Sequence, residues 1–252
     1  MCGRFGMLHT WTDMFESYRL ISTPLNVAPR FNIAPTQPVL AVIPSQVRKG
    51  NVATHFQWGL VPPWAKEVAI GSKMINARAE TVAEKPAFRQ AFRRRRCLIP
   101  ASGFYEWQKP TGEKGPNGPK QPFWISAADG GLLTFAGLWE SLMSADGSEL
   151  ETCTIITTTA NDALAPIHAR MPVIVAPADF QTWLDVSDET ATAAASALLR
   201  PAADSVTTAR PVSTRVNSVR NDDASLIEPG EASSEGGATF AAPAKNQGDL
   251  FS

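Results

Sequence analysis

Residues 97–107 read Cys97-Leu98-Ile99-Pro100-Ala101-Ser102-Gly103-Phe104-Tyr105-Glu106-Trp107, and this run predicts a strand, a turn and a second strand. In the second strand, successive side chains alternate between the two faces, so Glu106 points away from its aromatic neighbours Tyr105 and Trp107. If the face that carries Glu106 is enclosed, desolvation raises the pKa of the carboxyl and equips it for proton transfer. If that face is open, Glu106 is an ordinary surface residue.

Similar short runs on both sides of this unit predict a meander of strands, because they are rich in aliphatic and β-branched residues and are bounded by turn signals. The expected strands lie at 38–43, 51–58, 123–127, 132–138, 152–158 and 205–212. Short helices are expected at 12–18, 85–96, 178–184 and 189–199. The predicted fold class is therefore α+β, with a largely antiparallel β core flanked by short helices.

Composition indicates one globular domain, since the chain has 252 residues of which 44% are hydrophobic. The sequence has no apolar run of about 18 residues and no secretory leader, so we expect a cytoplasmic protein without a membrane span. The cysteines are Cys2, Cys97 and Cys153. Their odd number and wide spacing exclude a disulfide framework and a CxxC-type zinc site.

Charge is unevenly distributed along the chain. Residues 221–252 contain six acids and one base, which leaves 22 bases and 18 acids, a net charge of +4, in residues 1–220. A mildly basic body is compatible with a polyanionic partner. Because glycine, alanine, serine and acids dominate from residue 228 onward, we predict a folded domain over 1–227 and a disordered acidic tail over 228–252.

The last residues of the tail form a short motif. Gln247-Gly248-Asp249-Leu250-Phe251 resembles the Gln-x-x-Leu-Phe peptide by which bacterial proteins bind the replication sliding clamp. The expected contacts are Gln247, Leu250 and Phe251.

The N-terminus offers a reactive pair of groups. Removal of Met1 would place an α-amine and a thiol on neighbouring carbons of Cys2, with ordinary pKa values of about 7.7 to 8.0 and about 8.5. With an aldehyde, such a residue forms a Schiff base and then closes to a five-membered thiazolidine. In an N-terminal-nucleophile hydrolase, the thiol attacks an amide and the amine is its base. A third reading is that a cysteine follows the start codon by accident.

A stiff aromatic loop and a basic helix suggest contact with nucleic acid. Residues 58–66 hold Trp58 and Trp64 beside Lys66 and two prolines. Exposed rings there would stack on single-stranded bases at about 1 to 3 kcal/mol per base, whereas buried rings would belong to the core. The helix expected at 85–96 carries Arg89 and the run 93–96 on one face, which suits either phosphate binding or a solvated helix end.

Histidine is rare in this chain, which contains only His9, His55 and His168. His168 lies just before a buried-looking strand, where an imidazole is well placed for acid–base chemistry. A lone histidine is also often structural. The segment 32–35 is irregular and polar enough to line a site.

Six motifs, taken in order, resemble the SRAP (SOS-response-associated peptidase) family, whose members cross-link abasic sites in single-stranded DNA. The resemblance runs from residue 2 to about residue 220 and implies a barrel-like β core. The motifs are Cys2-Gly3-Arg4-Phe5, Asn32-Ile33-Ala34-Pro35, Trp58-Gly59-Leu60 with Pro63-Trp64-Ala65, Asn76-Ala77-Arg78-Ala79-Glu80, Gly103-Phe104-Tyr105-Glu106-Trp107 and His168-Ala169-Arg170-Met171-Pro172.

The resemblance implies roles for individual residues. Cys2 would form the cross-link, Asn76 would position the sugar or amine, Glu106 would be the acid and base, and His168 would assist opening of the deoxyribose ring. No metal or organic cofactor is implied, and we expect a monomer that joins the nucleoid on DNA damage. The expected DNA contacts combine residues of these motifs with those of the aromatic loop and the basic helix. They are Arg4, Asn32, Pro35, Trp58, Trp64, Arg78, Arg89, Trp107 and Thr157.

Two rival functions stay open at this point. A glutamine amidotransferase or related N-terminal-nucleophile hydrolase can also begin Met-Cys-Gly, although further motifs of a glutamine pocket are missing from the sequence. A non-catalytic single-strand-binding module predicts salt-sensitive binding that survives Cys2→Ala without forming an adduct.

Overall fold

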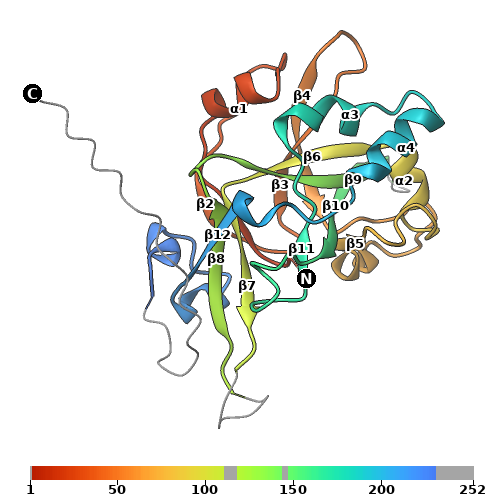
Figure 1. Ribbon diagram of the computed structural model, residues 1–252. Helices are drawn as coiled ribbons and strands as arrows, with labels where there is room; N and C mark the ends of the chain where they lie inside the picture. The colour runs from red at the N-terminus through yellow and green to blue at the C-terminus, as the bar shows by residue number, and fades with distance from the viewer. Residues whose placement is uncertain (1, 111–117, 144–146, 231–252) are drawn as a thin grey trace, which may run out of the picture.

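A closed β-barrel forms the centre of the computed structural model, which describes residues 2–110, 118–143 and 147–230. Its strands run in the order β10-β4-β3-β6-β9, and β9 pairs back onto β10 to close the ring (Figure 1). Every pair in the ring is antiparallel except β10 with β4, which is parallel. The barrel strands are β3 (Pro38–Pro44), β4 (Asn51–Trp58), β6 (Arg96–Ala101), β9 (Leu133–Met143) and β10 (Glu149–Thr159).

A second sheet lies against the barrel and is antiparallel throughout, in the order β12-β8-β7-β1-β2. Its strands are β1 (Phe5–Met7), β2 (Arg30–Ile33), β7 (Gly103–Gln108), β8 (Gln121–Ala127) and β12 (Thr207–Pro211). The predicted α+β class with a largely antiparallel, barrel-like core is confirmed. The expected meander is divided between two sheets.

The strand–turn–strand unit of residues 97–107 is where the chain passes from one sheet to the other. β6 belongs to the barrel and β7 to the second sheet, and Ser102 lies at the corner between them. The Ser102 amide donates to the Gly6 carbonyl at 2.8 Å, and its hydroxyl accepts from the Leu8 amide at 2.7 Å. Gly103 must be glycine because a Cβ there would lie 2.4 Å from the Trp124 ring.

Two short strands extend the barrel sheet beside β10. β5 (Asn76–Arg78) pairs with β10 in parallel, and β11 (Arg170–Pro172) pairs with it in antiparallel. Thr157 of β10 is opposite Arg78 on one side and Pro172 on the other. These pairings bring two segments that are far apart in sequence to the same end of β10. One is β5, which carries Asn76, and the other is the loop before β11, which carries His168.

The helices are short, as predicted, and α2, α3 and α4 lie together on one side of the barrel (Figure 1). Their bounds are α1 (Trp11–Ser17), α2 (Arg89–Arg94), α3 (Phe180–Leu184) and α4 (Glu189–Ala197), with 3-10 turns η1 (Val68–Lys73), η3 (Pro177–Asp179), η4 (Asp204–Val206), η5 (Thr214–Asn217) and η6 (Ala224–Ile227). The helix expected over 85–96 is shorter than predicted, because Arg96 already pairs with Leu138 as the first residue of β6.

Edge-to-face aromatic contacts join the second sheet to the barrel core. The Phe5 ring lies 5.3 Å from Trp58 and 5.9 Å from Phe135, which in turn lies 5.8 Å from Phe104. A smaller apolar cluster between the second sheet and the C-terminal turns contains Tyr105, Trp124, Val212, Val216 and Leu226. The N-terminal strand is thus fixed from both sides by burial of large rings.

Only part of the arginine run lies on the basic helix face that the sequence predicts: α2 exposes Arg89, Arg93 and Arg94, whereas Arg95 and Arg96 follow the helix. Arg96 is fully buried, and its guanidinium donates to the carbonyls of Phe92 and Trp183 at 2.6 Å each and to that of Asp185. Burial lowers the pKa of Arg96 to about 10. Arg95 forms an ion pair with Glu140 at 2.9 Å. Three backbone carbonyls fix the position of Arg96 and an acid fixes that of Arg95, so only Arg93 and Arg94 of the run are exposed.

Among the described residues, no helix is long and apolar enough to cross a membrane. The described chain ends at Gly230, whose amide donates to the Pro211 carbonyl at 3.0 Å. The predicted clamp-binding residues Gln247, Leu250 and Phe251 lie outside the described residues.

Candidate functional site

Glu106 is the buried acid at the centre of the candidate site. It lies on β7, is only 3% exposed, and places its Oε1 3.8 Å from Nδ1 of His168. Burial raises the pKa of the Glu106 carboxyl to about 7. The face that carries Glu106 is therefore enclosed, and this carboxyl can both take up and release a proton near neutral pH.

Cys2 lies beside Glu106 because of the β1–β7 register. Phe5 is opposite Phe104, and the Tyr105 amide donates to the Arg4 carbonyl at 2.9 Å, so the same register continued brings Cys2 next to the end of β7. The Cys2 side chain is fully buried. Burial raises the pKa of its thiol, and the negative charge of Glu106 raises it further. At neutral pH the sulfur is therefore a thiol, which needs a base to become a nucleophile.

Asn76 contributes an unused acceptor to the site. Its Nδ2 donates to the Ile75 carbonyl at 3.0 Å, whereas its Oδ1 is buried and has no hydrogen-bond partner among the described residues. The indole Nε1 of Trp58 donates to the same Ile75 carbonyl at 2.9 Å, and the Trp58 ring packs on Phe5. Trp58 therefore connects the N-terminal strand to Asn76. An unpaired buried acceptor costs about 1 to 3 kcal/mol, so Oδ1 is suited to receive a donor from a ligand.

His168 is held by Arg170, two residues further along the chain. The backbone N and O of Arg170 both lie 3.0 Å from Nδ1 of His168. The Arg170 guanidinium forms an ion pair with Glu80 and donates to the Thr157 carbonyl at 2.6 Å. This brace fixes the loop that carries His168 against β5 and β10. Burial lowers the pKa of His168 and favours the neutral imidazole.

Arg4 and Trp107 form a cation–π pair next to this cluster, with the guanidinium carbon 5.9 Å from the ring centroid. Arg4 Nη1 donates to Asn32 Oδ1 and to the Val216 carbonyl, both at 2.8 Å. Trp107 Nε1 donates to Asn217 Oδ1 at 2.8 Å. Both side chains are therefore positioned by the C-terminal turn η5 and by β2.

Three predicted DNA contacts are wrong as direct contacts, because Asn32, Trp58 and Thr157 have no exposed surface. Asn32 Nδ2 donates to the carbonyls of Ser218 and Asn221 at 3.1 and 2.7 Å. Thr157 Oγ1 lies at 3.5 Å from the Ala77 carbonyl. These side chains support the site from within the fold.

The remaining predicted DNA contacts have exposed surface. Trp64 is 57% exposed, Arg78 is exposed at the end of β5, and Pro35 is half-buried. Arg89 is exposed too, but α2 packs on β6, β9 and α4, which carry none of the cluster residues. The structure therefore does not bring Arg89 to the site.

The Glu80–Arg170 brace is the part of the site that sequence reasoning missed. Both residues lie inside motifs singled out above, but they are 90 positions apart and no local spacing pairs them. Opposite charges in two separate motifs were the only available signal.

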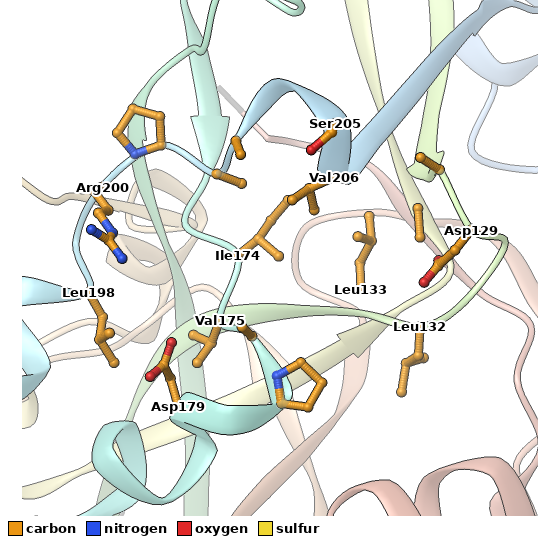
Figure 2. A pocket seen from close by; sticks show the side chains of 17 residues that line it. Asp129, Leu132, Leu133, Ile174, Val175, Asp179, Leu198, Arg200, Ser205 and Val206 are labelled. Atoms are coloured by element: carbon orange, nitrogen blue, oxygen red, sulfur yellow. The ribbon is translucent and has the colours of Figure 1, made fainter. Parts of the chain in front are cut away.

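A separate apolar pocket of about 890 Å³ lies away from the cluster. Figure 2 shows Leu133, Ile174 and Val206 around its centre, with Asp179 and Arg200 toward its border. None of the predicted site residues lines this pocket, so it is not part of the candidate site.

Comparison with known proteins identifies relatives along most of the chain. A family model described as SOS response associated peptidase (SRAP) matches residues 1–219. Abasic site processing protein YoaM of Bacillus subtilis is 40% identical over 230 residues, covering 90% of this chain and 98% of that protein. Abasic site processing protein YedK of Escherichia coli is 31% identical, covering 91% and 100%. A crystal structure of a Bacteroides thetaiotaomicron protein has a TM-score of 0.79 at 24% identity, covering 91% of this chain and 100% of that one, which shows a shared fold.

Proposed function

Because the chain belongs to the SOS response associated peptidase (SRAP) family, we propose that it processes abasic sites in single-stranded DNA by a covalent cross-link. The cross-link is a thiazolidine between Cys2 and the ring-opened deoxyribose. The observation that carries this proposal is the buried Glu106 carboxyl, 3.8 Å from His168 and beside the N-terminal strand. The names of the relatives, abasic site processing proteins, support the choice of lesion.

The first step opens the sugar. An abasic deoxyribose is a closed hemiacetal in equilibrium with a small amount of open aldehyde. Neutral His168 accepts the proton of the C1′ hydroxyl, and the protonated Glu106 carboxyl gives a proton to the ring oxygen as the C1′–O4′ bond breaks. The proton then returns from His168 to Glu106 across the short gap between them, so Glu106 is protonated again when the next step begins.

The second step joins the protein to the sugar. Hydrolytic removal of Met1 frees the Cys2 amine, which attacks C1′ and gives a carbinolamine. Asn76 Oδ1 accepts a hydrogen from this amine and orients it. Glu106 donates the proton with which the carbinolamine hydroxyl leaves as water, and a Schiff base forms.

The third step closes the ring. Glu106, now a carboxylate, takes the thiol proton of Cys2, and the sulfur attacks the Schiff-base carbon. The nitrogen keeps the proton that it carries in the protonated Schiff base, so the thiazolidine forms with the net loss of one water. The lesion is then shielded from strand cleavage during replication.

A denaturing gel tests this proposal directly. The purified protein is incubated with a single-stranded oligonucleotide that carries one abasic site, and the wild type should give a covalent adduct. Cys2→Ala should give none, whereas Cys153→Ala, a matched change at a buried cysteine remote from the N-terminus, should still react. Release of ammonia from glutamine without any adduct would favour the amidotransferase alternative. Salt-sensitive binding without any adduct would favour a non-catalytic binding module.

A further inference from the structure

Two lysines flank the mouth of the β7–β8 hairpin. Gln108 is opposite Gln121 at the end of the ladder, and Lys109 and Lys120 are the residues that adjoin this last pair. Both lysines are exposed, and neither has a hydrogen bond or ion pair among the described residues. Two positive charges held beside the same end of a strand pair repel each other, so an anion between them would relieve this repulsion.

The lysine pair lies close to the loop that carries His168. Gln108 Nε2 donates to the Pro166 carbonyl at 3.1 Å, which attaches the end of β7 to that loop. Burial lowers the pKa of His168, and the positive charges of Lys109 and Lys120 lower it further. Both ammonium groups are therefore within electrostatic reach of the imidazole.

Two arginines near the cluster are already engaged. Arg170 is paired with Glu80, and Arg4 Nη1 is shared between Asn32 and a backbone carbonyl. Lys109 and Lys120 thus provide uncommitted positive charge beside His168.

We propose that Lys109 and Lys120 form a phosphate-binding pair that holds the DNA backbone next to the lesion, on the His168 side of the site. The ligand is a phosphodiester, and the inference rests on the proposed function. An ammonium is a point charge on a flexible stem, which suits sequence-independent contact with a backbone phosphate. Held there, the strand presents the sugar to His168 and Glu106.

The test uses a single-stranded oligonucleotide that carries a tetrahydrofuran analogue of the abasic site. The analogue has no aldehyde, so binding is measured without cross-linking. The affinities of the wild type and of Lys109→Gln/Lys120→Gln are compared between about 50 and 200 mM salt. Each lost phosphate contact should reduce the log–log salt slope by about 0.7, so the affinity ratio of wild type to variant should shrink about sevenfold over this range.

Two matched variants sharpen the result. Lys49→Gln/Lys85→Gln removes two exposed lysines outside the cluster and should leave the slope unchanged. Lys109→Arg/Lys120→Arg keeps the charge and should restore the wild-type slope. A wild-type slope in the Lys109/Lys120 glutamine variant would overturn the phosphate pair. That outcome is distinct from failure of the proposed function, which shows as absence of a wild-type adduct with a natural abasic site.

Discussion

Nδ1 of His168 lies 3.8 Å from Oε1 of Glu106, although β7, which carries Glu106, and β11, which follows His168, belong to different sheets. Glu106 is on β7 of the second sheet, and His168 is in the loop that enters β11 beside the barrel strand β10. The contact forms only when the two sheets are packed together. Proton transfer at this site therefore depends on the packing of the whole domain.

The raised pKa of Glu106 predicts a pH dependence of stability. The carboxyl has a pKa of about 7 in the folded chain, against an ordinary value of 4.5, so the folded state holds the proton more tightly than the unfolded state between these values. Wild-type stability should therefore fall as the pH rises through that window, by on the order of 3 kcal/mol.

Glu106→Gln removes this titration. The variant should be as stable as the wild type near pH 4.5 and more stable at pH 8, and it should lose cross-linking activity at both. Urea unfolding at the two pH values measures the difference. Parallel stability curves for the two proteins would show that Glu106 is not desolvated in the folded chain.

Replacing His168 separates chemistry from binding. His168→Asn should slow adduct formation by about 100-fold or more, the usual effect of losing a general acid or base, because ring opening loses its proton acceptor. Affinity for the tetrahydrofuran analogue should stay near the wild-type value, since His168 supplies no fixed positive charge at neutral pH. Single-turnover rates and equilibrium binding give the two numbers. If the rate of adduct formation and the affinity for the analogue fell by the same factor, His168 would be a binding residue instead.

The two tryptophans of the 58–66 loop should behave in opposite ways. Trp64 is 57% exposed, so Trp64→Ala should weaken DNA binding by about 1 to 3 kcal/mol if one base stacks on it, with little change in stability. Trp58 is fully buried, and Trp58→Phe removes its hydrogen bond to the Ile75 carbonyl. That variant should lose about 1 to 3 kcal/mol of stability and keep its affinity for DNA. Thermal unfolding and fluorescence titration distinguish the two outcomes.

Arg96 should be a stability residue. Arg96→Met leaves the carbonyls of Phe92, Trp183 and Asp185 without their donor, so the free energy of unfolding should fall by about 3 kcal/mol or more. The neighbouring exposed change Arg94→Met should stay within about 0.5 kcal/mol of the wild type. DNA affinity that falls with Arg96→Met in a fully folded variant would speak against this assignment.

Most strands could be predicted because their signal is local. The aliphatic runs at β3, β4 and β6 and the turn at Ser102-Gly103 are visible in a window of a few residues. Closure of the barrel has no local signal and was implied only by the family resemblance, because it depends on the parallel pairing of β4 with β10, about 100 residues apart. The corner at Ser102, where the chain changes sheets, looks like any hairpin turn in the sequence.

The candidate site was likewise predictable only in part. Glu106 and His168 stand out from local alternation and from the scarcity of histidine, but their contact is a product of tertiary structure. Trp58 and Arg96 were misassigned for a physical reason. Ring stacking and positive charge are visible in sequence, whereas the buried carbonyls that bind an indole or a guanidinium come from distant segments.

The most direct test of the central claim is the intact mass of the protein before and after incubation with a single-stranded abasic oligonucleotide. The account predicts a starting chain that lacks Met1 and a product equal to that chain plus the oligonucleotide less one water, with no such product from Cys2→Ala. A chain that keeps Met1 when made in cells, or an unchanged mass after incubation under mild conditions, would contradict it.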